Sequence, residues 1–283
     1  RMIAEEGHSC RLYAPVGGHR DLLAYLVRRL LENGANSSFV HQLADTSLSE
    51  AELLRDPVAI VRAAGLSPNP HIPRPPDLFG PERRNSTGID LADAEVLATT
   101  VGEVEAALRN PFRGAARVGG RDGAGPSRPV SAPFDPSLVV GEAVDAGPAE
   151  VEAALASAAS HAPAWDAVPV GERAAMLERL ADALEADRPA LLALLQAEAG
   201  KTLPDALAEV REAVDFCRYY AAQARNLLKP VSLPGPTGEA NVLRLHGRGL
   251  FVTIAPWNFP LAIFLGQTVA ALVAGNAVIA KPA

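Results

Sequence analysis

The sequence predicts an α/β fold, and two regions of the 283-residue chain carry that prediction. Residues 250–254 and 277–280 are short runs of apolar and β-branched side chains, as in buried strands. Residues 261–274, between them, are rich in Ala, Leu, Val and Gln, a helical composition. A strand, a helix and a strand without a hairpin signal indicate a parallel crossover. Near the N-terminus, a short strand at 11–15 precedes an amphipathic helix at 21–32.

Composition limits the class of protein. With 48% hydrophobic residues and a net charge of −7, the chain can bury a core but lacks the basic excess of a nucleic-acid-binding protein. Its two cysteines, Cys10 and Cys217, show neither metal-ligand spacing nor a disulfide framework, so we expect each to be a buried apolar residue. The six histidines show no paired ligand spacing, and we predict no metal site.

No targeting or membrane segment is predicted. The N-terminus lacks the apolar core of a secretory signal, which favours a cytoplasmic location. The long uncharged run 249–280 is interrupted by two prolines and by the amides of Asn258, Gln267 and Asn276. Its clean helical part is only about 14 residues, a length typical of a buried helix.

The crossover carries two polar side chains at the ends of its strands. Pro256 and Pro260 bracket a rigid loop after the first strand, and Asn258 lies between them. Lys281 follows the second strand, so both side chains are expected at the ligand-binding edge of the sheet. The amide could stabilise an oxyanion, and the lysine could bind cofactor hydroxyls or phosphate. Spacing alone favours a structural interpretation, with Asn258 capping the next helix.

The literal residues resemble a known family. The run Ile254-Ala-Pro-Trp-Asn-Phe-Pro260, with Gly275-Asn276 and Lys281-Pro282, resembles the cofactor-binding segment of the aldehyde dehydrogenase superfamily. The resemblance implies that the Asn258 amide donates to the oxyanion of a thiohemiacetal and that Lys281 holds the adenosine ribose of NAD. The positions that it places beside the nicotinamide half of NAD are Ile254, Ala255, Pro256 and Trp257.

The N-terminal helix also carries a polar stripe. Tyr25, Arg28, Arg29 and Glu32 follow the spacing i, i+3, i+4 and i+7, so they line up on one side of the helix. Adjacent guanidinium groups can clamp a carboxylate through charge-assisted hydrogen bonds. Spacing alone favours the alternative, a solvated face with a Glu–Arg pair.

Here too the residues themselves are more specific. The run Tyr13-Ala-Pro-Val-Gly17 and the following residues 22–40 resemble the last strand and helix of the proline dehydrogenase barrel in the bifunctional proline utilization A family. The resemblance implies that Arg28 and Arg29 bind the proline carboxylate. It also implies that Tyr13, Tyr25 and Glu32 line the proline site over FAD.

Together these features predict three parts. Residues 1–45 are expected to be the C-terminal end of a (β/α)8 barrel, residues 46–136 a helical and proline-rich connector, and residues 137–283 the N-terminal part of a Rossmann-like aldehyde dehydrogenase domain. The connector should hold a helix capped by Ser49, a second helix at 93–109, and, at 111–136, a loop or a domain boundary that is dense in Gly, Arg and Pro. Its residues 82–90 match the connector of the same bifunctional family.

The third part begins with a predicted strand at 138–144. Helices should follow from Pro148, over 172–186, over 189–199 and from Pro204. Residues 200–202 look like the end of a phosphate-binding loop, but no glycine stands at the required earlier position, so we expect a helix C-cap.

The resemblance implies a protein that oxidises proline with FAD and then glutamate semialdehyde with NAD, and that forms a homo-oligomer. The family's cysteine nucleophile and general base are expected beyond Ala283, and most of the flavin barrel before Arg1, so the chain is expected to be an inactive fragment. Two alternatives remain: another NAD-dependent aldehyde dehydrogenase with an unrelated N-terminal extension, or a non-catalytic interaction protein. A DNA-binding module and peripheral membrane association are not addressed by this stretch.

Overall fold

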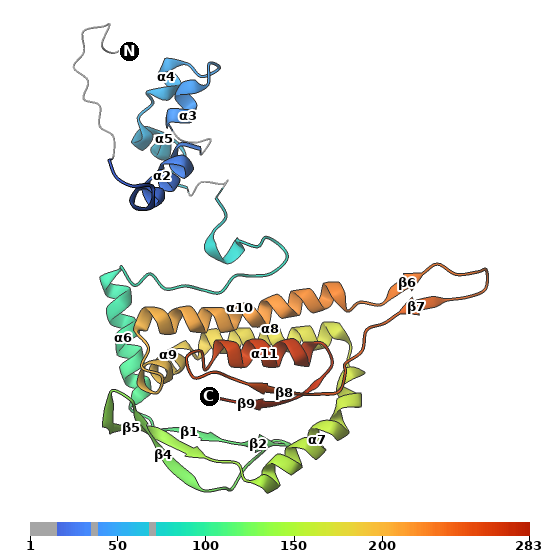
Figure 1. Cartoon of the computed structure of the whole chain (residues 1–283). Coiled ribbons are helices and arrows are strands. Elements are labelled where there is room, and N and C mark those ends of the chain that lie inside the picture. The colour runs from blue at the N-terminus through green and yellow to red at the C-terminus, as the bar shows by residue number, and fades with distance from the viewer. Residues whose placement is uncertain (1–15, 35–38, 68–71) are drawn as a thin grey trace. The chain divides into compact units, whose positions relative to one another are not determined.

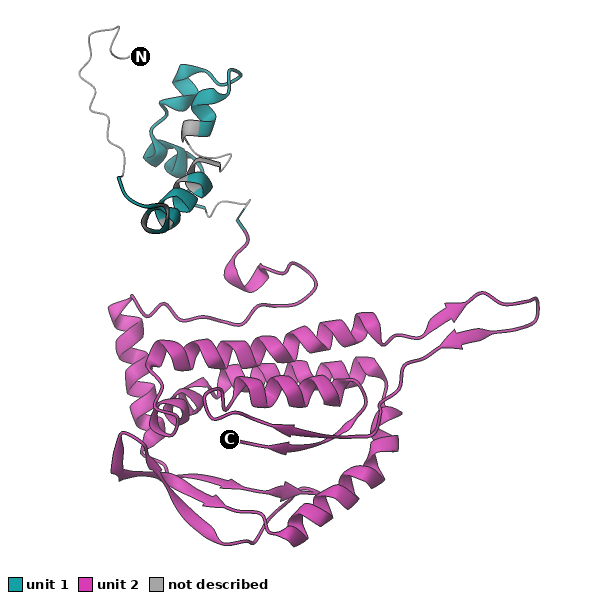
Figure 2. Cartoon of the chain, in the orientation of Figure 1, with its two compact units in different colours: residues 1–72 teal, residues 73–283 magenta. Residues whose placement is uncertain are grey.

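The computed structural model describes residues 16–34, 39–67 and 72–283. The chain divides into two compact units, residues 1–72 and 73–283 (Figure 2). The strand expected at 11–15 lies outside the described residues, as do Cys10 and Tyr13.

Unit 1 is helical where it is described. The predicted amphipathic helix at 21–32 is confirmed within α2 (His19–Gly34), and α3 (Phe39–Ala44) follows it (Figure 1). Ser49 begins α4 (Glu50–Leu53), as predicted, through a capping box in which its side chain accepts from the Glu52 N–H.

The prediction of a single helix after Ser49 is wrong, because two short helices, α4 and a second one, occupy that stretch. The second, α5 (Pro57–Ala63), begins with Pro57 at its first turn, and the Asp56 side chain accepts a hydrogen bond from the Val58 N–H. A new cap followed by proline starts a separate helix rather than continuing the first.

Unit 2 opens with a 3₁₀ turn, η1 (Pro75–Asp77), and an extended segment that leads to α6 (Ala94–Leu108). The helix predicted at 93–109 is confirmed, with the Asp93 side chain as its N-cap. Polar contacts fasten the extended segment: the Ser86 N–H and hydroxyl donate to Asp215 at 3.0 and 2.7 Å, and the Thr87 N–H donates to Glu185 at 2.7 Å.

The prediction of a loop at 111–136 is wrong, because this stretch forms strands. In chain order they are β1 (Phe112–Ala115), β2 (Arg117–Val118), β3 (Arg121–Asp122), β4 (Ser127–Ala132) and β5 (Asp135–Val144). β5 lies between β1, its parallel neighbour, and β4, its antiparallel neighbour, while β2 pairs with β3. The strand predicted at 138–144 is confirmed within β5.

Four helices follow, as predicted: α7 (Pro148–Asp166), α8 (Val170–Ala186), α9 (Arg188–Ala197) and α10 (Leu203–Leu227). The predicted C-cap before α10 is also confirmed. Gly200 adopts a φ of +67°, its N–H binds the Gln196 carbonyl at 3.1 Å, and the Lys201 N–H binds the Leu195 carbonyl at 3.2 Å. A hairpin of β6 (Val231–Leu233) and β7 (Asn241–Leu243) then projects from the helices (Figure 1).

The predicted parallel crossover is confirmed. β8 (Leu250–Ile254) pairs in parallel with β9 (Ala277–Lys281) from Leu250 opposite Ala277 to Ile254 opposite Lys281, and α11 (Ala262–Val273) connects them. Gly275 ends α11 with a φ of +94°. The next residue, Asn276, does not have a positive φ, and its buried side chain accepts hydrogen bonds from the Arg248 and Gly249 N–H groups at 2.6 and 3.2 Å.

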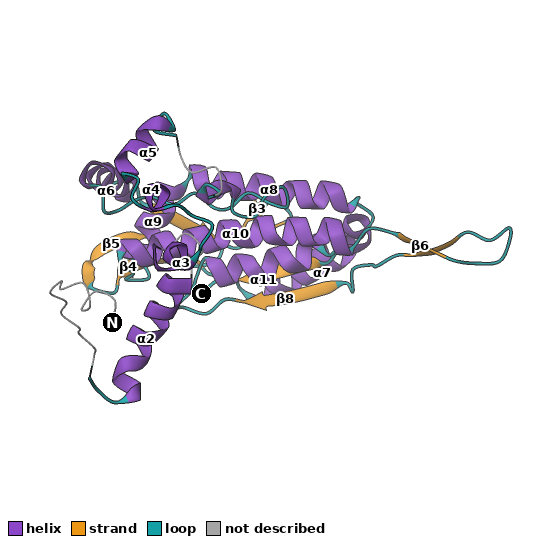
Figure 3. Ribbon diagram, turned by 90° about the horizontal axis from the view of Figure 1, so that it is seen from above, coloured by secondary structure: helices purple, strands orange, loops and turns teal. Residues whose placement is uncertain are grey.

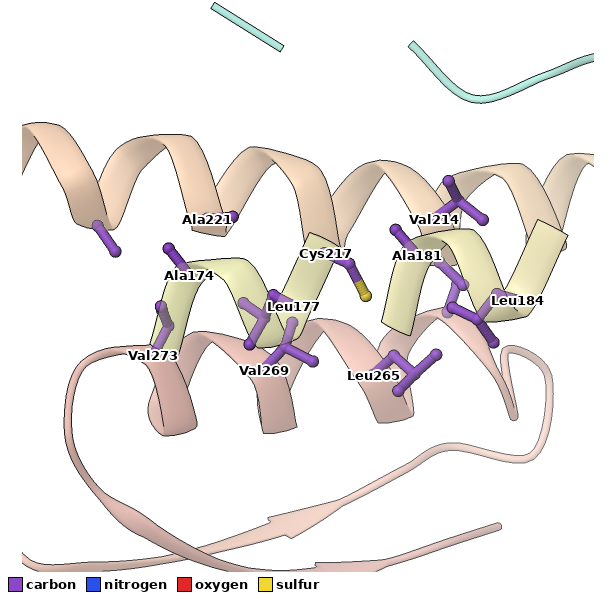
Figure 4. Packing of buried hydrophobic residues seen from close by; sticks show 13 residues of the cluster. Ala174, Leu177, Ala181, Leu184, Val214, Cys217, Ala221, Leu265, Val269 and Val273 are labelled. Atoms are coloured by element: carbon purple, nitrogen blue, oxygen red, sulfur yellow. The ribbon is translucent and has the colours of Figure 1, made fainter. Parts of the chain in front are cut away.

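The main core lies between α8, α10 and α11, which run side by side (Figures 3 and 4). Small residues on α8 and α10 let these helices approach closely, and branched side chains of α11 fill the space between them. The labelled members of the cluster in Figure 4 are Ala174, Leu177, Ala181, Leu184, Val214, Cys217, Ala221, Leu265, Val269 and Val273. This packing fixes α11, and therefore the loop that enters it.

Candidate functional site

The ends of β8 and β9 form the candidate site. The parallel ladder continues one step past Ile254, because the Ala255 N–H donates to the Lys281 carbonyl at 3.1 Å. Both strands therefore end at one edge, and Asn258 follows in the next turn of the loop. The sequence prediction that Asn258 and Lys281 follow neighbouring parallel strands is confirmed.

The loop exposes its large apolar side chains at this edge. Trp257 is 80% exposed and Ile254 is 64% exposed, while Ala255 between them is buried. Asn258 and Lys281 are also exposed. The edge thus offers an apolar surface, an amide donor and an ammonium group to a ligand.

A buried carboxylate holds the far end of the same loop. The Glu209 side chain of α10 is fully buried, and its Oε1 accepts hydrogen bonds from the Leu261 and Ala262 N–H groups at 2.8 and 3.2 Å. The Lys201 Nζ lies 2.8 Å from the Glu209 Oε2 and 4.5 Å from the centre of the Phe259 ring. Glu209, which lies some fifty residues before the loop, was not predicted from the sequence.

Side chains also satisfy the carbonyl end of α11. The Trp165 Nε1 donates to the Leu272 carbonyl at 2.8 Å, and the Arg173 Nε donates to the Val273 carbonyl at 3.0 Å. Helix ends leave backbone groups without intrahelical partners, so these contacts replace water at a buried terminus. Polar side chains therefore hold α11 at both of its ends.

Asp166 organises the opposite edge of the two strands. Its Oδ1 accepts from the Gly247 N–H at 2.8 Å and its Oδ2 lies 2.9 Å from the His246 Nδ1. The hydrogen bond from Gly247, and then the one with His246, lower the pKa of the Asp166 carboxyl despite an opposing effect of burial. Because these residues precede β8, we assign them to the turn rather than to the candidate site.

Cys217 behaves as the sequence predicted, as a buried apolar residue. It is fully buried in the core, and desolvation raises the pKa of its thiol to about 12. A thiol with so little thiolate at neutral pH is a poor nucleophile.

The paired arginines of the N-terminal helix are only partly described. Tyr25 is half-buried and Arg28 is exposed on α2. Arg29 and Glu32 also belong to α2, but their side chains lie outside the described part of the structure, and so does the whole of Tyr13. The role of this stripe in binding a carboxylate stays a prediction.

The described residues contain neither a candidate metal centre nor a candidate membrane-spanning helix. Over 16–34, 39–67 and 72–283, no group of three or more His, Cys, Asp or Glu side chains is arranged to hold a metal ion. In the same ranges, no helix combines the length and the apolar character needed to cross a bilayer.

The edge suits a dinucleotide. Flat aromatic and branched apolar surfaces can pack against a nicotinamide ring, and an exposed ammonium can donate to ribose hydroxyls. Both kinds of group occur here on Trp257, Ile254 and Lys281. The carboxyl edge of parallel strands is also where open α/β sheets bind such ligands.

The family model of the aldehyde dehydrogenase family matches residues 122–283, more than half of the chain. This chain belongs to the aldehyde dehydrogenase family. A second model, that of proline dehydrogenase, matches residues 1–42. The predicted α/β fold class and the resemblance to the bifunctional proline utilization A proteins are confirmed, whereas the exact limits predicted for the three parts stay predictions.

Relatives align with nearly the whole chain. It is 48% identical over 281 residues to the bifunctional protein PutA of Escherichia coli strain K12, an alignment that covers 97% of this chain and 20% of the relative. The crystal structure of the D779W mutant of Bradyrhizobium japonicum proline utilization A covers 100% of this chain and 26% of its own, with 47% identity and a TM-score of 0.70. The aldehyde dehydrogenase part is also 40% identical over 151 residues to 1-pyrroline-5-carboxylate dehydrogenase 2 of Bacillus subtilis, covering 53% of this chain and 29% of that protein. The chain thus spans about a fifth of the length of its PutA relatives.

Proposed function

We propose that the protein containing this chain oxidises L-proline to pyrroline-5-carboxylate with FAD, and then oxidises glutamate semialdehyde, the hydrolysed form, to glutamate with NAD. Matches to both family models on one chain, and the names of the relatives that align with both ends, support this pair of reactions. The observation that carries the second reaction is the shared edge of β8 and β9, which places Asn258 and Lys281 on neighbouring strand ends.

Asn258 is the proposed oxyanion donor. When a thiol adds to an aldehyde, the carbonyl oxygen becomes an oxyanion, and a fixed amide N–H lowers the free energy of that state more than that of the substrate. Its position between two prolines, with β8 before it and α11 after it, limits the movement of the amide. The nucleophile is proposed to be a cysteine other than the buried Cys217.

The cofactor of the second step would lie against the exposed edge. Lys281 would donate to ribose hydroxyls, while Ile254, Ala255, Pro256 and Trp257 would form the surface beside the nicotinamide. When bound there, NAD would accept a hydride equivalent from the aldehyde carbon. The chain's own groups would orient the substrate and exclude water from the reacting carbon.

The first substrate would bind at α2. Arg28 and Arg29 would clamp the proline carboxylate through charge-assisted hydrogen bonds, and Tyr13, Tyr25 and Glu32 would line the same site. FAD would supply the oxidising power, and these residues would bind the substrate rather than the flavin. This role also explains why two adjacent arginines are preferable to lysines, since guanidinium groups bind carboxylates in a bidentate manner.

Replacing Asn258 in the full-length gene product tests the proposal. In Asn258→Ala, kcat for NAD-dependent oxidation of glutamate semialdehyde is expected to fall about 10²–10³-fold, the usual loss for one oxyanion donor. Asn110→Ala, at an exposed position beyond α6, is the matched control and should leave kcat unchanged. A loss well below about tenfold in Asn258→Ala would reject the oxyanion role.

The same preparation can test the proposed assembly. We propose a cytoplasmic homo-oligomer that binds small-molecule substrates. Analytical ultracentrifugation of the full-length gene product should give a mass above that of a monomer, and a monomer at all concentrations would contradict the proposal.

A further inference from the structure

The buried ion pair between Lys201 and Glu209 lies directly beside the Asn258 loop. We propose that this pair positions the C-terminal half of the loop and thereby holds Asn258 in its catalytic orientation. The inference rests on the proposed role of Asn258 as the oxyanion donor. It assigns to Lys201 and Glu209 a positioning role in addition to the contact of Glu209 with the start of α11.

Glu209 is a fully buried acidic residue of α10 that lies against the start of α11. Its side chain has no exposed surface, and an isolated carboxylate in such a place would be very unfavourable. Two backbone N–H groups at the start of α11 and the ammonium of Lys201 compensate for its lost hydration. The position also suits a negative charge, because the N-terminal end of a helix carries partial positive charge.

Lys201 connects this carboxylate to the loop itself. The C-cap at Gly200 turns the chain so that the Lys201 side chain, only 14% exposed, reaches over α10 to Glu209. Its ammonium also lies 4.5 Å from the centre of the Phe259 ring, within the range of a cation–π contact. Lys201 therefore contacts the residue that immediately follows Asn258, and Glu209 contacts the backbone two residues further on.

The loop is thus held at its two ends by different groups. Its first residues are fixed by the sheet, through the hydrogen bond from the Ala255 N–H to the Lys281 carbonyl. Its last residues are fixed by Glu209 and Lys201. Loss of the ion pair should therefore displace Asn258 while leaving the surface at Ile254 and the Lys281 ammonium in place.

This division predicts a specific kinetic result in the full-length gene product. Lys201→Met, which keeps an apolar stem of similar length, should lower kcat for semialdehyde oxidation by about tenfold or more, since a displacement of about 1 Å can cost on the order of 10²-fold. The Kd for NAD should stay within about twofold, because each tenfold in Kd needs a loss of about 1.4 kcal/mol of contact energy. Lys201→Arg, which retains the charge, should recover most of the lost kcat.

Glu185→Gln is the matched control for a general loss of stability. Glu185 also pairs with a buried cation, Arg218, at 3.0 Å, and it binds the Thr87 N–H rather than the loop. It should lower the thermal midpoint without lowering kcat. If Lys201→Met lowers kcat no more than Glu185→Gln does, or if Lys201→Arg fails to restore it, the positioning role is overturned.

Hydrogen exchange separates this inference from the proposed function. In Glu209→Ala, the amides of Leu261 and Ala262 should exchange faster in a peptide covering 257–266, because they lose their acceptor. Unchanged exchange would overturn the inference even if Asn258→Ala abolishes catalysis. Faster exchange with full activity in Asn258→Ala would support the anchoring and reject the catalytic role of Asn258.

Discussion

Ile254 and Lys281 form the last pair of the parallel ladder between β8 and β9, and the Ala255 N–H donates to the Lys281 carbonyl at 3.1 Å. The lysine backbone therefore fixes the start of the Asn258 loop, while the lysine side chain is exposed at the same edge. One residue thus contributes to both the fold and the surface, and its side chain can be replaced without removing the hydrogen bond made by its backbone.

Lys281→Met should weaken NAD binding without unfolding the protein. Because the Lys281 side chain is exposed, its replacement leaves no buried group without a partner, and the thermal midpoint should hardly change. We expect the Kd for NAD to rise about tenfold, which corresponds to about 1.4 kcal/mol and fits one lost charge-assisted contact. Isothermal titration of NAD into the full-length gene product measures this.

Lys229→Met is the matched control for this charge. Lys229 is also exposed but lies in the connection between α10 and β6. Its replacement should leave the Kd for NAD unchanged. An equal effect of both substitutions would show that general electrostatic attraction, and not a contact of Lys281, accounts for binding.

Gly275→Ala should destabilise unit 2. The residue has a φ of +94°, and an added Cβ would lie 2.3 Å from the Asp166 Oδ1. Strain at a positive φ alone costs about 1–2 kcal/mol for a residue with a Cβ, and the contact with Asp166 should add to that cost. Gly102→Ala should have the opposite effect, because Gly102 lies within α6 and an added Cβ there would meet no other atom within 4 Å outside the helix backbone.

Thermal and denaturant unfolding of both glycine variants can be compared directly. Gly102→Ala should stabilise the protein by about 0.5–1 kcal/mol, the usual gain for alanine within a helix. If Gly275→Ala were as stable as the unmodified chain, the left-handed C-cap of α11 would be wrong.

The Asp166 carboxyl should contribute to the acid sensitivity of the fold. Its pKa is lowered in the folded state from the ordinary 3.8, so its stabilisation is complete at pH values above 3.8 and is lost as the pH falls through the lowered pKa. Asp166→Asn keeps an acceptor for Gly247 but loses the charge, which should cost about 1–3 kcal/mol at pH 7. As the pH falls below 5, the free energy of unfolding should decrease less in the variant than in the unmodified chain, because the variant lacks the carboxyl group that takes up a proton.

Unfolding by urea across that pH range tests the sign of this effect. A parallel decline of stability in both proteins on acidification would show that Asp166 does not carry a lowered pKa. His246→Ala, which removes the second hydrogen-bond partner, should give a smaller effect, because the Gly247 N–H is the larger cause of the shift.

Cys217 should be inert to thiol reagents in the folded protein. With a pKa of about 12, only about one molecule in 10⁴ carries the thiolate at pH 8. Because the side chain is completely buried, a reagent also cannot reach the sulfur in the folded protein. Mass spectrometry of peptides after iodoacetamide treatment should show labelling of Cys217 only after denaturation, and Cys217→Ala should keep its activity in semialdehyde oxidation.

The crossover could be predicted from the sequence because its signals are local. A run of β-branched residues, two prolines and a glycine at the end of the helix each restrict the backbone within a few residues. The same holds for the cap at Ser49, which the structure shows to begin α4.

The strands over 111–136 could not be predicted, because their stabilising partners are distant and their composition is that of a loop. β1 and β4 are held by pairing with β5 and by ion pairs of their arginines: Arg113 with Glu142 of β5 at 2.9 Å, and Arg128 with Asp145, the residue after β5, at 3.1 Å. Glu209 was missed for a similar reason. Its place on α10 is compatible with an ordinary exposed glutamate, and only the packing of α11 shows what it binds.

The most direct test of the central claim is a crossed measurement on one preparation of the full-length gene product, in which both reactions are assayed in each variant. Asn258→Ala should lower NAD-dependent semialdehyde oxidation by about 10²-fold or more and leave proline oxidation unchanged. The double variant Arg28→Ala, Arg29→Ala should do the reverse, raising the KM for proline by at least about tenfold through the loss of its carboxylate clamp. Unchanged proline turnover in the arginine variant, or unchanged semialdehyde oxidation in Asn258→Ala, would contradict the assignment of both reactions to this chain.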